Sequence, residues 1–243
     1  MTTSGFVAGT LVHTDKGLVP IEQLQVGDMV LSKHESGQGE QAYKRVVKTF
    51  KSEAKQPIWR IKCTGGTEQN GDIFYCLFFS TIDNPFYVFR YDEWLWIALV
   101  DLDCDKFDSY NNIEIHTLES VEMFAFLDNT HLAWSPNYNS VEQYPEVFVD
   151  FQNHQQIYSV ESYYDGWSSY DLPYENVIFV ESEKDMLIGD YKATINKMVG
   201  DPFYDDVYNI EVEDFHTYYV GKAGLLSHDL TSIATYKYIP HQD

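Results

Sequence analysis

The sequence predicts an all-β protein, and three observations support this. Glycine and proline residues interrupt the chain early, and the apolar residues between them alternate with polar ones instead of recurring every three or four positions. Several segments are rich in the aromatic and β-branched residues that strands favour. With 243 residues, 44% of them hydrophobic and 16% aromatic, the chain is long enough to bury a core in one large domain or two small ones.

The expected strands follow this alternation along the chain. Short strands are predicted at Val7–His13, Met29–Ser32, Val46–Phe50 and Ile58–Cys63, with turns at Gly17, Gly27-Asp28 and residues 36–39. Strands buried on both faces are predicted where the sequence is most aromatic and β-branched, at Ile73–Thr81 and Phe86–Trp96. Two further strands are predicted at Val207–Val212 and Tyr218–Val220. Weak helical periodicity limits helices to Ser182–Met186 and to parts of Asp101–Ser109 and Leu118–Leu127.

The chain carries a large negative charge, with 38 Asp and Glu residues against 16 Lys and Arg, and a formal net charge of −22. A nucleic acid needs clustered cations to meet its phosphates, so this balance argues against nucleic-acid binding and favours a basic protein partner. The charge is uneven, because residues 101–200 contain 19 acidic and 4 basic side chains and so contribute −15 of the −22. These acidic residues either solubilise loops and strand edges or, with the aromatic residues between them, form a binding face.

The sequence predicts a protein of the cytoplasm. The longest apolar runs, Ile73–Phe79 and Trp94–Val100, have seven residues each, whereas a membrane-spanning helix needs about twenty. The first residues lack the basic and apolar regions of a secretory signal. No CxxC pair occurs among the three cysteines, which are Cys63, Cys76 and Cys104. We therefore expect reduced thiols, no metal site and no cofactor.

Three separate blocks of the sequence resemble one known family. The first block is formed by residues 4–12 (SGFVAGTLV) and 17–31 (GLVPIEQLQVGDMVL), the second by residues 81–88 (TIDNPFYV), and the third by residues 207–221 (VYNIEVEDFHTYYVG) and 227–229 (SHD). In this order the blocks resemble the Hint (hedgehog/intein) domain of bacterial polymorphic-toxin proteins. The resemblance implies a compact, all-β, Hint-type horseshoe of short strands in which the two chain ends meet.

The same resemblance divides the chain into three parts. Residues 1–105 and 201–230 form the Hint-like scaffold. Residues 106–200 have no clear counterpart and are predicted to be a large acidic, aromatic insertion or second lobe. Residues 231–243 follow as a C-terminal tail.

The N-terminal reaction of the family is expected to be lost. Hint domains begin with a Cys or Ser whose side chain attacks the preceding carbonyl carbon, and the resemblance puts Gly5, which has no nucleophile, at that position. Ser4 stands one residue early, which reverses the direction of its side chain on a strand. Only three residues precede Ser4, so no N-terminal cargo is expected. The family's Thr-x-x-His segment occurs as Thr81 and Asn84, and an amide cannot shuttle a proton near neutral pH.

The C-terminal reaction is also expected to be impaired. The family ends in a His followed by an Asn, whose side-chain amide cyclises on its own carbonyl carbon and cuts the chain. The resemblance places His228 and Asp229 at these positions, with His216 as a second retained histidine upstream. A carboxylate can attack its own peptide carbonyl, but it does so poorly when ionised. Leu230 follows without a nucleophilic side chain, so splicing is excluded.

The resemblance therefore implies a pseudoenzyme that binds rather than cuts, because the groups that cleave peptide bonds are replaced. We expect an immunity or accessory protein of a bacterial toxin system that binds a basic toxin or toxin module. The alternative is residual autoproteolysis that releases the tail after Asp229. The expected binding residues lie in the acidic, aromatic segment: Tyr163, Tyr164, Asp165, Trp167, Tyr170, Asp171, Glu175, Glu181 and Glu183.

Restoring the family residues tests this interpretation. Gly5→Cys, Asn84→His and Asp229→Asn, introduced together, are expected to recover cleavage because Thr81 and both histidines are still present to orient the reaction.

Overall fold

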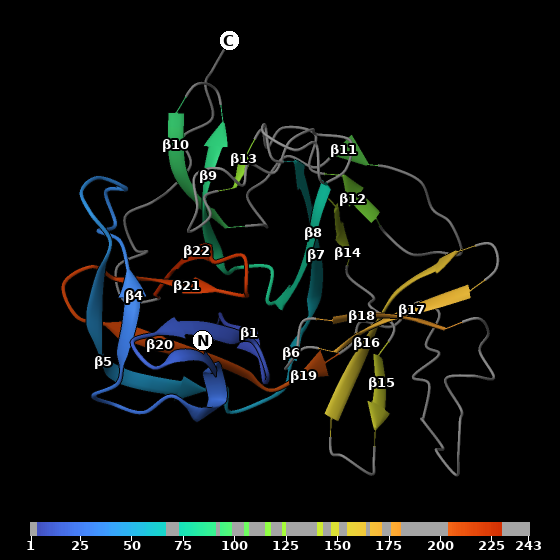
Figure 1. The fold of residues 1–243 in the computed structure, drawn as a ribbon, viewed down its shortest axis with the longest axis horizontal. Helices are drawn as coiled ribbons and strands as arrows, with labels where there is room; N and C mark the ends of the chain where they lie inside the picture. The colour runs from blue at the N-terminus through green and yellow to red at the C-terminus, as the bar shows by residue number, and fades with distance from the viewer. Residues whose placement is uncertain are drawn as a thin grey trace.

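The computed structural model describes residues 4–66, 73–90, 93–98 and 204–229, together with short strands between residues 105 and 180. Side chains are described for residues 4–61, 78–89, 94–98 and 204–229. Within these ranges the chain forms strands and one short 3-10 turn, Ile21–Gln23, and it contains no α-helix. The protein is therefore all-β, as its sequence predicts (Figure 1).

The strands of the first hundred residues are β1 (Phe6–Val7), β2 (Leu11–Thr14), β3 (Gly17–Pro20), β4 (Met29–Ser32), β5 (Ala42–Lys51), β6 (Gln56–Pro57), β7 (Trp59–Gly66), β8 (Ile73–Ser80), β9 (Pro85–Arg90) and β10 (Glu93–Ala98). The next are β11 (Asp105–Lys106), β12 (Ile115–Thr117), β13 (Met123–Phe124), β14 (Ser140–Glu142), β15 (Val147–Asp150), β16 (Gln155–Tyr163), β17 (Gly166–Asp171) and β18 (Asn176–Val180). The last are β19 (Tyr204–Asp205), β20 (Val207–Val212), β21 (Thr217–Val220) and β22 (Leu225–His228).

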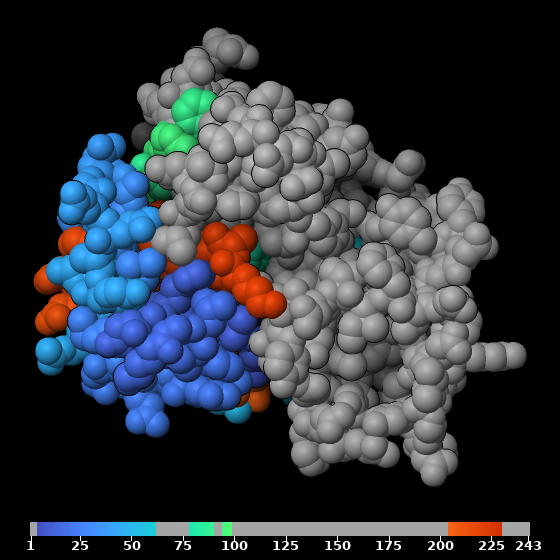
Figure 2. All heavy atoms as spheres, viewed as in Figure 1, coloured from blue at the N-terminus to red at the C-terminus, as the bar shows by residue number. Residues whose placement is uncertain are grey.

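Most of these strands belong to one large sheet. Its order is β10-β9-β22-β21-β2-β4-β5-β20-β1-β8-β7-β14-β12-β11, with β13 paired to β9 and β3 paired to β2. Strands from the two ends of the sequence alternate in this order, because β20 lies between β1 and β5 and β21 lies beside β2. In Figure 2 the blue N-terminal and orange-red C-terminal atoms accordingly lie side by side.

The core lies where these interleaved strands pack their apolar residues together. Phe6 of β1 is fully buried and makes edge-to-face contacts with Phe86 of β9, at 6.0 Å between ring centroids, and with Tyr218 of β21, at 6.3 Å. Both β21 and β22 are buried along their whole length, which explains why residues of both parities in these strands are mostly apolar. The polar exceptions in β22, Ser227 and His228, therefore point to a site inside the protein.

The structure confirms several of the expected strands and corrects others. Met29–Ser32 and Val207–Val212 are strands with the expected bounds. The expected single strand Phe86–Trp96 is wrong, because β9 and β10 form an antiparallel pair in which Arg90 lies opposite Glu93. The local sign of this division is the charged interruption at residues 90–93 (RYDE), which the prediction of a single strand overlooked.

Two further expectations fail within the described residues. Val7–His13 is divided between β1 and β2 by a turn in which Gly9 has a φ of +85°, a conformation that favours glycine. The short strands β11 and β13 occupy parts of the segments 101–109 and 118–127, where helices were expected. The expected helix Ser182–Met186 lies outside the described residues.

The strands between residues 105 and 180 belong to two different sheets. Strands β15 to β18 form a separate four-stranded antiparallel sheet, seen at the right of Figure 1. Strand β14 instead pairs with β7, and β13 pairs with β9, so part of this segment extends the large sheet. The division at residue 106 remains a prediction from the sequence.

Candidate functional site

The Ser4–Gly5 peptide bond is held by hydrogen bonds at both of its polar ends. The N–H group of Gly5 donates to Thr81 Oγ1 at 3.1 Å, and the carbonyl oxygen of Ser4 accepts from Asn209 Nδ2 at 3.1 Å. A second bond from the N–H group of Thr81 to the Gly5 carbonyl oxygen, at 3.0 Å, fixes the segment that follows β8 against β1. The expected positions Gly5 and Thr81 therefore do meet, around one buried peptide group.

Asn84 connects the N-terminal and C-terminal parts of the scaffold. Its Oδ1 accepts a hydrogen bond from Ser4 Oγ at 2.9 Å, and its Nδ2 donates to Ser227 Oγ at 3.2 Å. All three side chains are buried, and Ser227 Oγ donates onward to the carbonyl oxygen of Pro85 at 3.3 Å. Asn84 thus satisfies buried polar groups on both sides. It has this structural role at the position where the resemblance leads one to expect a histidine.

Gly5 leaves no room for a side chain. A Cβ atom built on Gly5 would lie 2.3 Å from the carbonyl oxygen of Tyr208 and 2.9 Å from its carbonyl carbon, both backbone atoms of the paired strand β20. Backbone in the middle of a sheet cannot move aside as a flexible side chain does. The expectation that Gly5→Cys helps to restore cleavage is therefore in conflict with the packing of β1 on β20.

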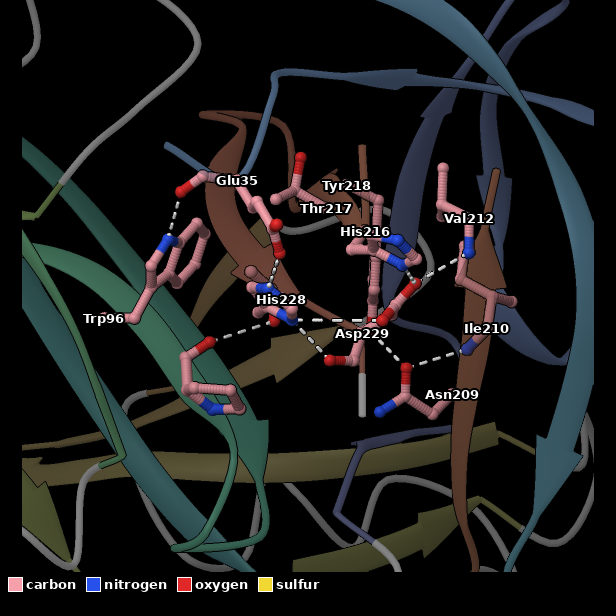
Figure 3. Close-up of polar contacts among 12 residues, drawn as sticks. Glu35, Trp96, Asn209, Ile210, Val212, His216, Thr217, Tyr218, His228 and Asp229 are labelled. Atoms are coloured by element: carbon pink, nitrogen blue, oxygen red, sulfur yellow. Dashed lines mark hydrogen bonds and ion pairs between the residues drawn. The ribbon is translucent and has the colours of Figure 1, made fainter. Parts of the chain in front are cut away.

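Asp229 is fully buried and makes several hydrogen bonds around the end of β22. Its Oδ2 accepts from the N–H group of Val212 at 2.8 Å and lies 3.3 Å from His216 Nδ1. Its own N–H group donates to the carbonyl oxygen of His216 at 2.7 Å. Figure 3 shows the carboxylate lying between the His216 ring and β20. The carboxylate is therefore fixed in place by the backbone of β20 and by one imidazole.

His216 reaches Asp229 from a turn with unusual backbone geometry. The turn between β20 and β21 contains the only two non-glycine residues with positive φ in the described part of the chain, Asp214 at 63° and His216 at 57°. The left-handed region is costly for a residue with a side chain, and such conformations persist where the surroundings enforce them. Here the Asp229 N–H group and the Asp229 carboxylate hold the backbone and the ring of His216 respectively.

His228 is fully buried and contacts acceptors through both of its ring nitrogens. Its Nδ1 contacts the carbonyl oxygen of Asp229 and lies 3.9 Å from Asp229 Oδ1, while its Nε2 lies 3.3 Å from Glu35 Oε2. The ring of Trp96 packs edge-to-face on the His228 ring at 4.9 Å, and the His216 ring lies parallel to it at 6.4 Å (Figure 3). His216, His228 and Asp229 thus form one cluster.

Asn209 and Tyr218 lie between the two groups of residues. Asn209 donates to the Ser4 carbonyl oxygen, and its Oδ1 accepts from the Tyr218 hydroxyl at 2.9 Å and from the N–H group of Ile210 at 2.7 Å. Burial and the nearby Asp229 carboxylate raise the pKa of Tyr218 far above its ordinary value, so the phenol stays protonated and acts as a donor. Asn209 and Tyr218 therefore extend the buried polar network around Ser4 toward Asp229.

The expected binding residues of the acidic segment are only partly placed. Tyr163 is the last residue of β16 and lies opposite Gly166, and β17 contains Trp167, Tyr170 and Asp171. The remaining residues, Tyr164, Asp165, Glu175, Glu181 and Glu183, lie outside the described residues. The binding face therefore stays a prediction from the sequence.

Glu35, Trp96 and Asn209 were not predicted from the sequence as residues of this site, and Ser227 was noted only as part of the block 227–229. Glu35 lies 193 positions from His228 in the sequence, so no local pattern joins them. Asn209 is a polar residue inside an otherwise largely apolar strand, and it is buried beside Ile210. An amide at a buried strand position indicates a polar partner inside the protein.

Within the described residues, no group of three His, Cys, Asp or Glu side chains is arranged to hold a metal ion. The described residues also contain no helix that is long and apolar enough to cross a membrane.

Comparison with known proteins finds inteins among the similar solved structures. No protein-family model matches the sequence, and no curated protein is significantly similar to it. A solution structure of a bacterial intein-like domain from Clostridium thermocellum is 20% identical, with 94% of this chain and 100% of that chain covered and a TM-score of 0.43. A DnaB intein from Synechocystis sp. PCC 6803 is 11% identical over 94% of this chain and 99% of that chain, with a TM-score of 0.44.

The gp41-1 intein is a third similar structure, 13% identical over 94% of this chain and 100% of that chain, with a TM-score of 0.40.

Proposed function

We propose that this chain is a Hint-like protein that has lost the N-terminal reaction and cleaves its own backbone at the Asp229–Leu230 peptide bond. The observation that carries the proposal is the contact between His228 Nδ1 and the carbonyl oxygen of Asp229, beside a buried Asp229 carboxylate. A donor on that oxygen stabilises the negative charge that develops when the carbonyl carbon is attacked.

In the proposed reaction an Asp229 carboxylate oxygen attacks the carbonyl carbon of the same residue and closes a five-membered ring. The bond between that carbon and the Leu230 nitrogen breaks, and the nitrogen leaves as an amine after taking a proton from His228. Water then opens the cyclic anhydride and returns the proton to His228. One water molecule is consumed overall, and the chain ends in a new carboxyl group at Asp229.

The two reactions of the family are separable in this molecule. At the N-terminal site the nucleophile position is Gly5, and Asn84 is committed to hydrogen bonds with Ser4 and Ser227. At the C-terminal site both histidines contact Asp229, so the three groups needed for ring closure are together. Loss of the first site therefore leaves the second intact, which favours the autoproteolysis that the sequence analysis held as its alternative.

The proposal is tested by the intact mass of the full-length chain during incubation at neutral pH. We expect slow appearance of residues 1–229 and 230–243, whose masses together exceed the parent by one water. Asp229→Asn should accelerate release, because ring closure by the amide gives a cyclic imide, which the leaving amine re-opens far less readily than it re-opens a cyclic anhydride. His228→Ala should slow it on the order of 100-fold, the lower end of what a general acid contributes.

The matched control is Asp206→Ala, which removes a surface carboxylate that pairs with Lys51 and should leave the rate unchanged. If neither the unmodified chain nor Asp229→Asn releases residues 230–243, the proposed cleavage is refuted.

A second candidate function is the binding of a basic protein, which the charge distribution favours. Residues 101–200 carry −15, and aromatic residues are interleaved with the acids, as in residues 162–170 (SYYDGWSSY). In a bacterial toxin system this would be the role of a cytoplasmic immunity or accessory protein that binds a basic toxin. The two candidates are compatible, because cleavage belongs to the scaffold and binding to the acidic segment.

A further inference from the structure

Glu35 lies on the segment between β4 and β5, and several contacts hold this segment over His228. At its base, Thr217 Oγ1 accepts from the N–H group of Lys33 at 3.1 Å and also contacts Ser32 Oγ at 3.0 Å. At its far side, Trp96 Nε1 donates to the Glu35 carbonyl oxygen at 2.6 Å, and the Tyr87 hydroxyl donates to the Ser36 carbonyl oxygen at 3.4 Å. The position of Glu35 is therefore determined by three other strands, β9, β10 and β21.

Glu35 is the acidic group on the side of His228 that faces away from the scissile bond. Its Oε2 lies 3.3 Å from His228 Nε2, while the opposite nitrogen, Nδ1, contacts the Asp229 carbonyl oxygen. A ring that donates from both nitrogens is positively charged. In the part of the chain that the structure describes, the carboxylates of Glu35 and Asp229 face this ring, and the His216 ring lies parallel to it at 6.4 Å.

Trp96 contacts both Glu35 and His228. Its indole N–H group binds the Glu35 backbone, and its ring packs on the edge of the His228 ring at 4.9 Å with an interplanar angle of 85°. Figure 3 shows Glu35 above the His228 ring, with Trp96 at its side. The backbone of Glu35 and the plane of the imidazole are thus set by the same side chain, which pre-organises their contact.

We propose that Glu35 is a positioning residue for the cleavage of the Asp229–Leu230 bond: its carboxylate accepts the Nε2 proton of a His228 ring that carries protons on both nitrogens, and so turns the Nδ1–H group toward the Asp229 carbonyl oxygen. This inference rests on the proposed function. It assigns to Glu35 the role that a carboxylate has when it fixes the orientation and proton arrangement of a catalytic histidine.

The first test compares Glu35→Gln with Glu40→Gln in the full-length chain. Glu40 is an exposed residue of the same segment, so both substitutions remove one negative charge from it. We expect Glu35→Gln to slow the release of residues 230–243 about tenfold, a part of the roughly 100-fold or more that a general acid supplies. Glu40→Gln should not change the rate, and neither should change the melting temperature by more than a few degrees.

The second test does not depend on cleavage. In a ¹H–¹⁵N NMR spectrum of the Asp229→Ala chain, the Nε2 proton of His228 should be visible and slow to exchange with water. Glu35→Ala should make this proton exchange at least about tenfold faster, whereas Glu40→Ala should not.

The outcomes separate the two proposals. If the chain cleaves and Glu35→Gln behaves like Glu40→Gln, or if the Nε2 proton is unaffected by Glu35→Ala, the role of Glu35 is refuted and the proposed function stands. If the chain never cleaves but the proton responds to Glu35→Ala, the contact is real, the proposed function fails, and the role of Glu35 in cleavage fails with it.

Discussion

At the scale of single residues, the two ends of the site differ in how much space their backbone leaves. Gly5 sits so close to Tyr208 that only a hydrogen atom fits where other residues have a Cβ. Asp229, in contrast, has a buried side chain whose oxygens have partners within hydrogen-bond distance. Gly5 thus leaves no room for a nucleophilic side chain, whereas Asp229 has a carboxylate in a polar environment.

Gly5→Ala is expected to destabilise the protein. Overpacking against a strand backbone costs about 1–3 kcal/mol in the free energy of unfolding, because β1 or β20 must shift. A suitable comparison is Gly39→Ala, where no atom lies within 4 Å of the added Cβ but φ is +83°, so the cost of about 1 kcal/mol is conformational. Urea unfolding of both variants measures the difference.

The combined variant with Gly5→Cys, Asn84→His and Asp229→Asn should fail to cut at Ser4–Gly5, because the side chain added by Gly5→Cys has no room beside Tyr208. Cleavage there would show that the strands can adapt.

His13 should make stability depend on pH. Burial lowers the pKa of His13 below its ordinary value of 6.5, although its Nε2 contacts the Gly221 carbonyl oxygen at 2.8 Å. Because the folded chain resists protonation, the unfolded chain binds more protons as pH falls below about 6.5, and the free energy of unfolding decreases in that range. His13→Gln should flatten this decrease between about pH 6.5 and 5, as followed by thermal melting. An unchanged profile would mean that other groups set the acid sensitivity.

At the scale of elements, the turn between β20 and β21 is the part of the scaffold that brings β20, His216 and Asp229 together. Strand β20 supplies the Val212 N–H group, the turn supplies His216, and the pairing of β21 with β22 places Thr217 opposite His228. Positive φ values at Asp214 and His216 make the turn tight enough for this arrangement.

Substitutions at His216 should separate the chemistry from the fold. Asn tolerates the left-handed conformation, so His216→Asn should keep the melting temperature close to that of the unmodified chain while it slows release of residues 230–243. A β-branched residue does not tolerate it, so His216→Val should also destabilise the protein by about 1–3 kcal/mol. Parallel measurements of melting and cleavage check both. Equal cleavage in His216→Asn and in the unmodified chain would remove His216 from the mechanism.

Strands were predictable from the sequence wherever their pattern was local. Met29–Ser32 alternates between partly and fully buried residues, so its period of two was visible. The pair β9 and β10 was predicted as one strand, because its aromatic and apolar residues outweighed the charged interruption at residues 90–93 (RYDE) where the two strands separate. The residues of the candidate site were likewise predictable only where they belong to a local sequence pattern. His228 and Asp229 were identified by a motif, whereas Glu35 reaches His228 only because distant segments fold together, and Asn209 likewise reaches the distant Ser4 carbonyl oxygen.

At the scale of the whole molecule, the surplus of negative charge and the candidate cleavage site lie in different parts of the chain. The scaffold places several lysines beside aspartates of its own C-terminal part, with Lys44 at 3.0 Å from Asp214, Lys51 at 2.8 Å from Asp206 and Lys55 at 3.6 Å from Asp205. These lysines already have carboxylate partners near them. The surplus of −15 in residues 101–200 is therefore the largest charge that the molecule can offer to a basic partner.

If residues 101–200 bind such a partner, charge and aromatic substitutions should act on different rate constants. Neutralising Asp165, Asp171, Glu175, Glu181 and Glu183 together should lower the association rate and flatten its dependence on salt, because these charges would steer the encounter. Trp167→Ala should instead raise the dissociation rate and cost about 2 kcal/mol of binding free energy, as expected for an aromatic anchor. The partner is first captured from the native host, and surface-based kinetics are then compared with melting of the free protein.

Melting of the free protein distinguishes a binding face from a packed one. A core tryptophan would lower the melting temperature when truncated, because a cavity remains in the sheet formed by β15 to β18. A tryptophan that anchors a partner would leave the melting temperature nearly unchanged and weaken only the complex. Cleavage after Asp229 should be unaffected by Trp167→Ala and by the five neutral substitutions, since neither changes a contact described for His216, His228 or Asp229. Unchanged affinity in all these variants would exclude this segment as the binding face, whereas a parallel loss of binding and cleavage would show that the two functions share one site.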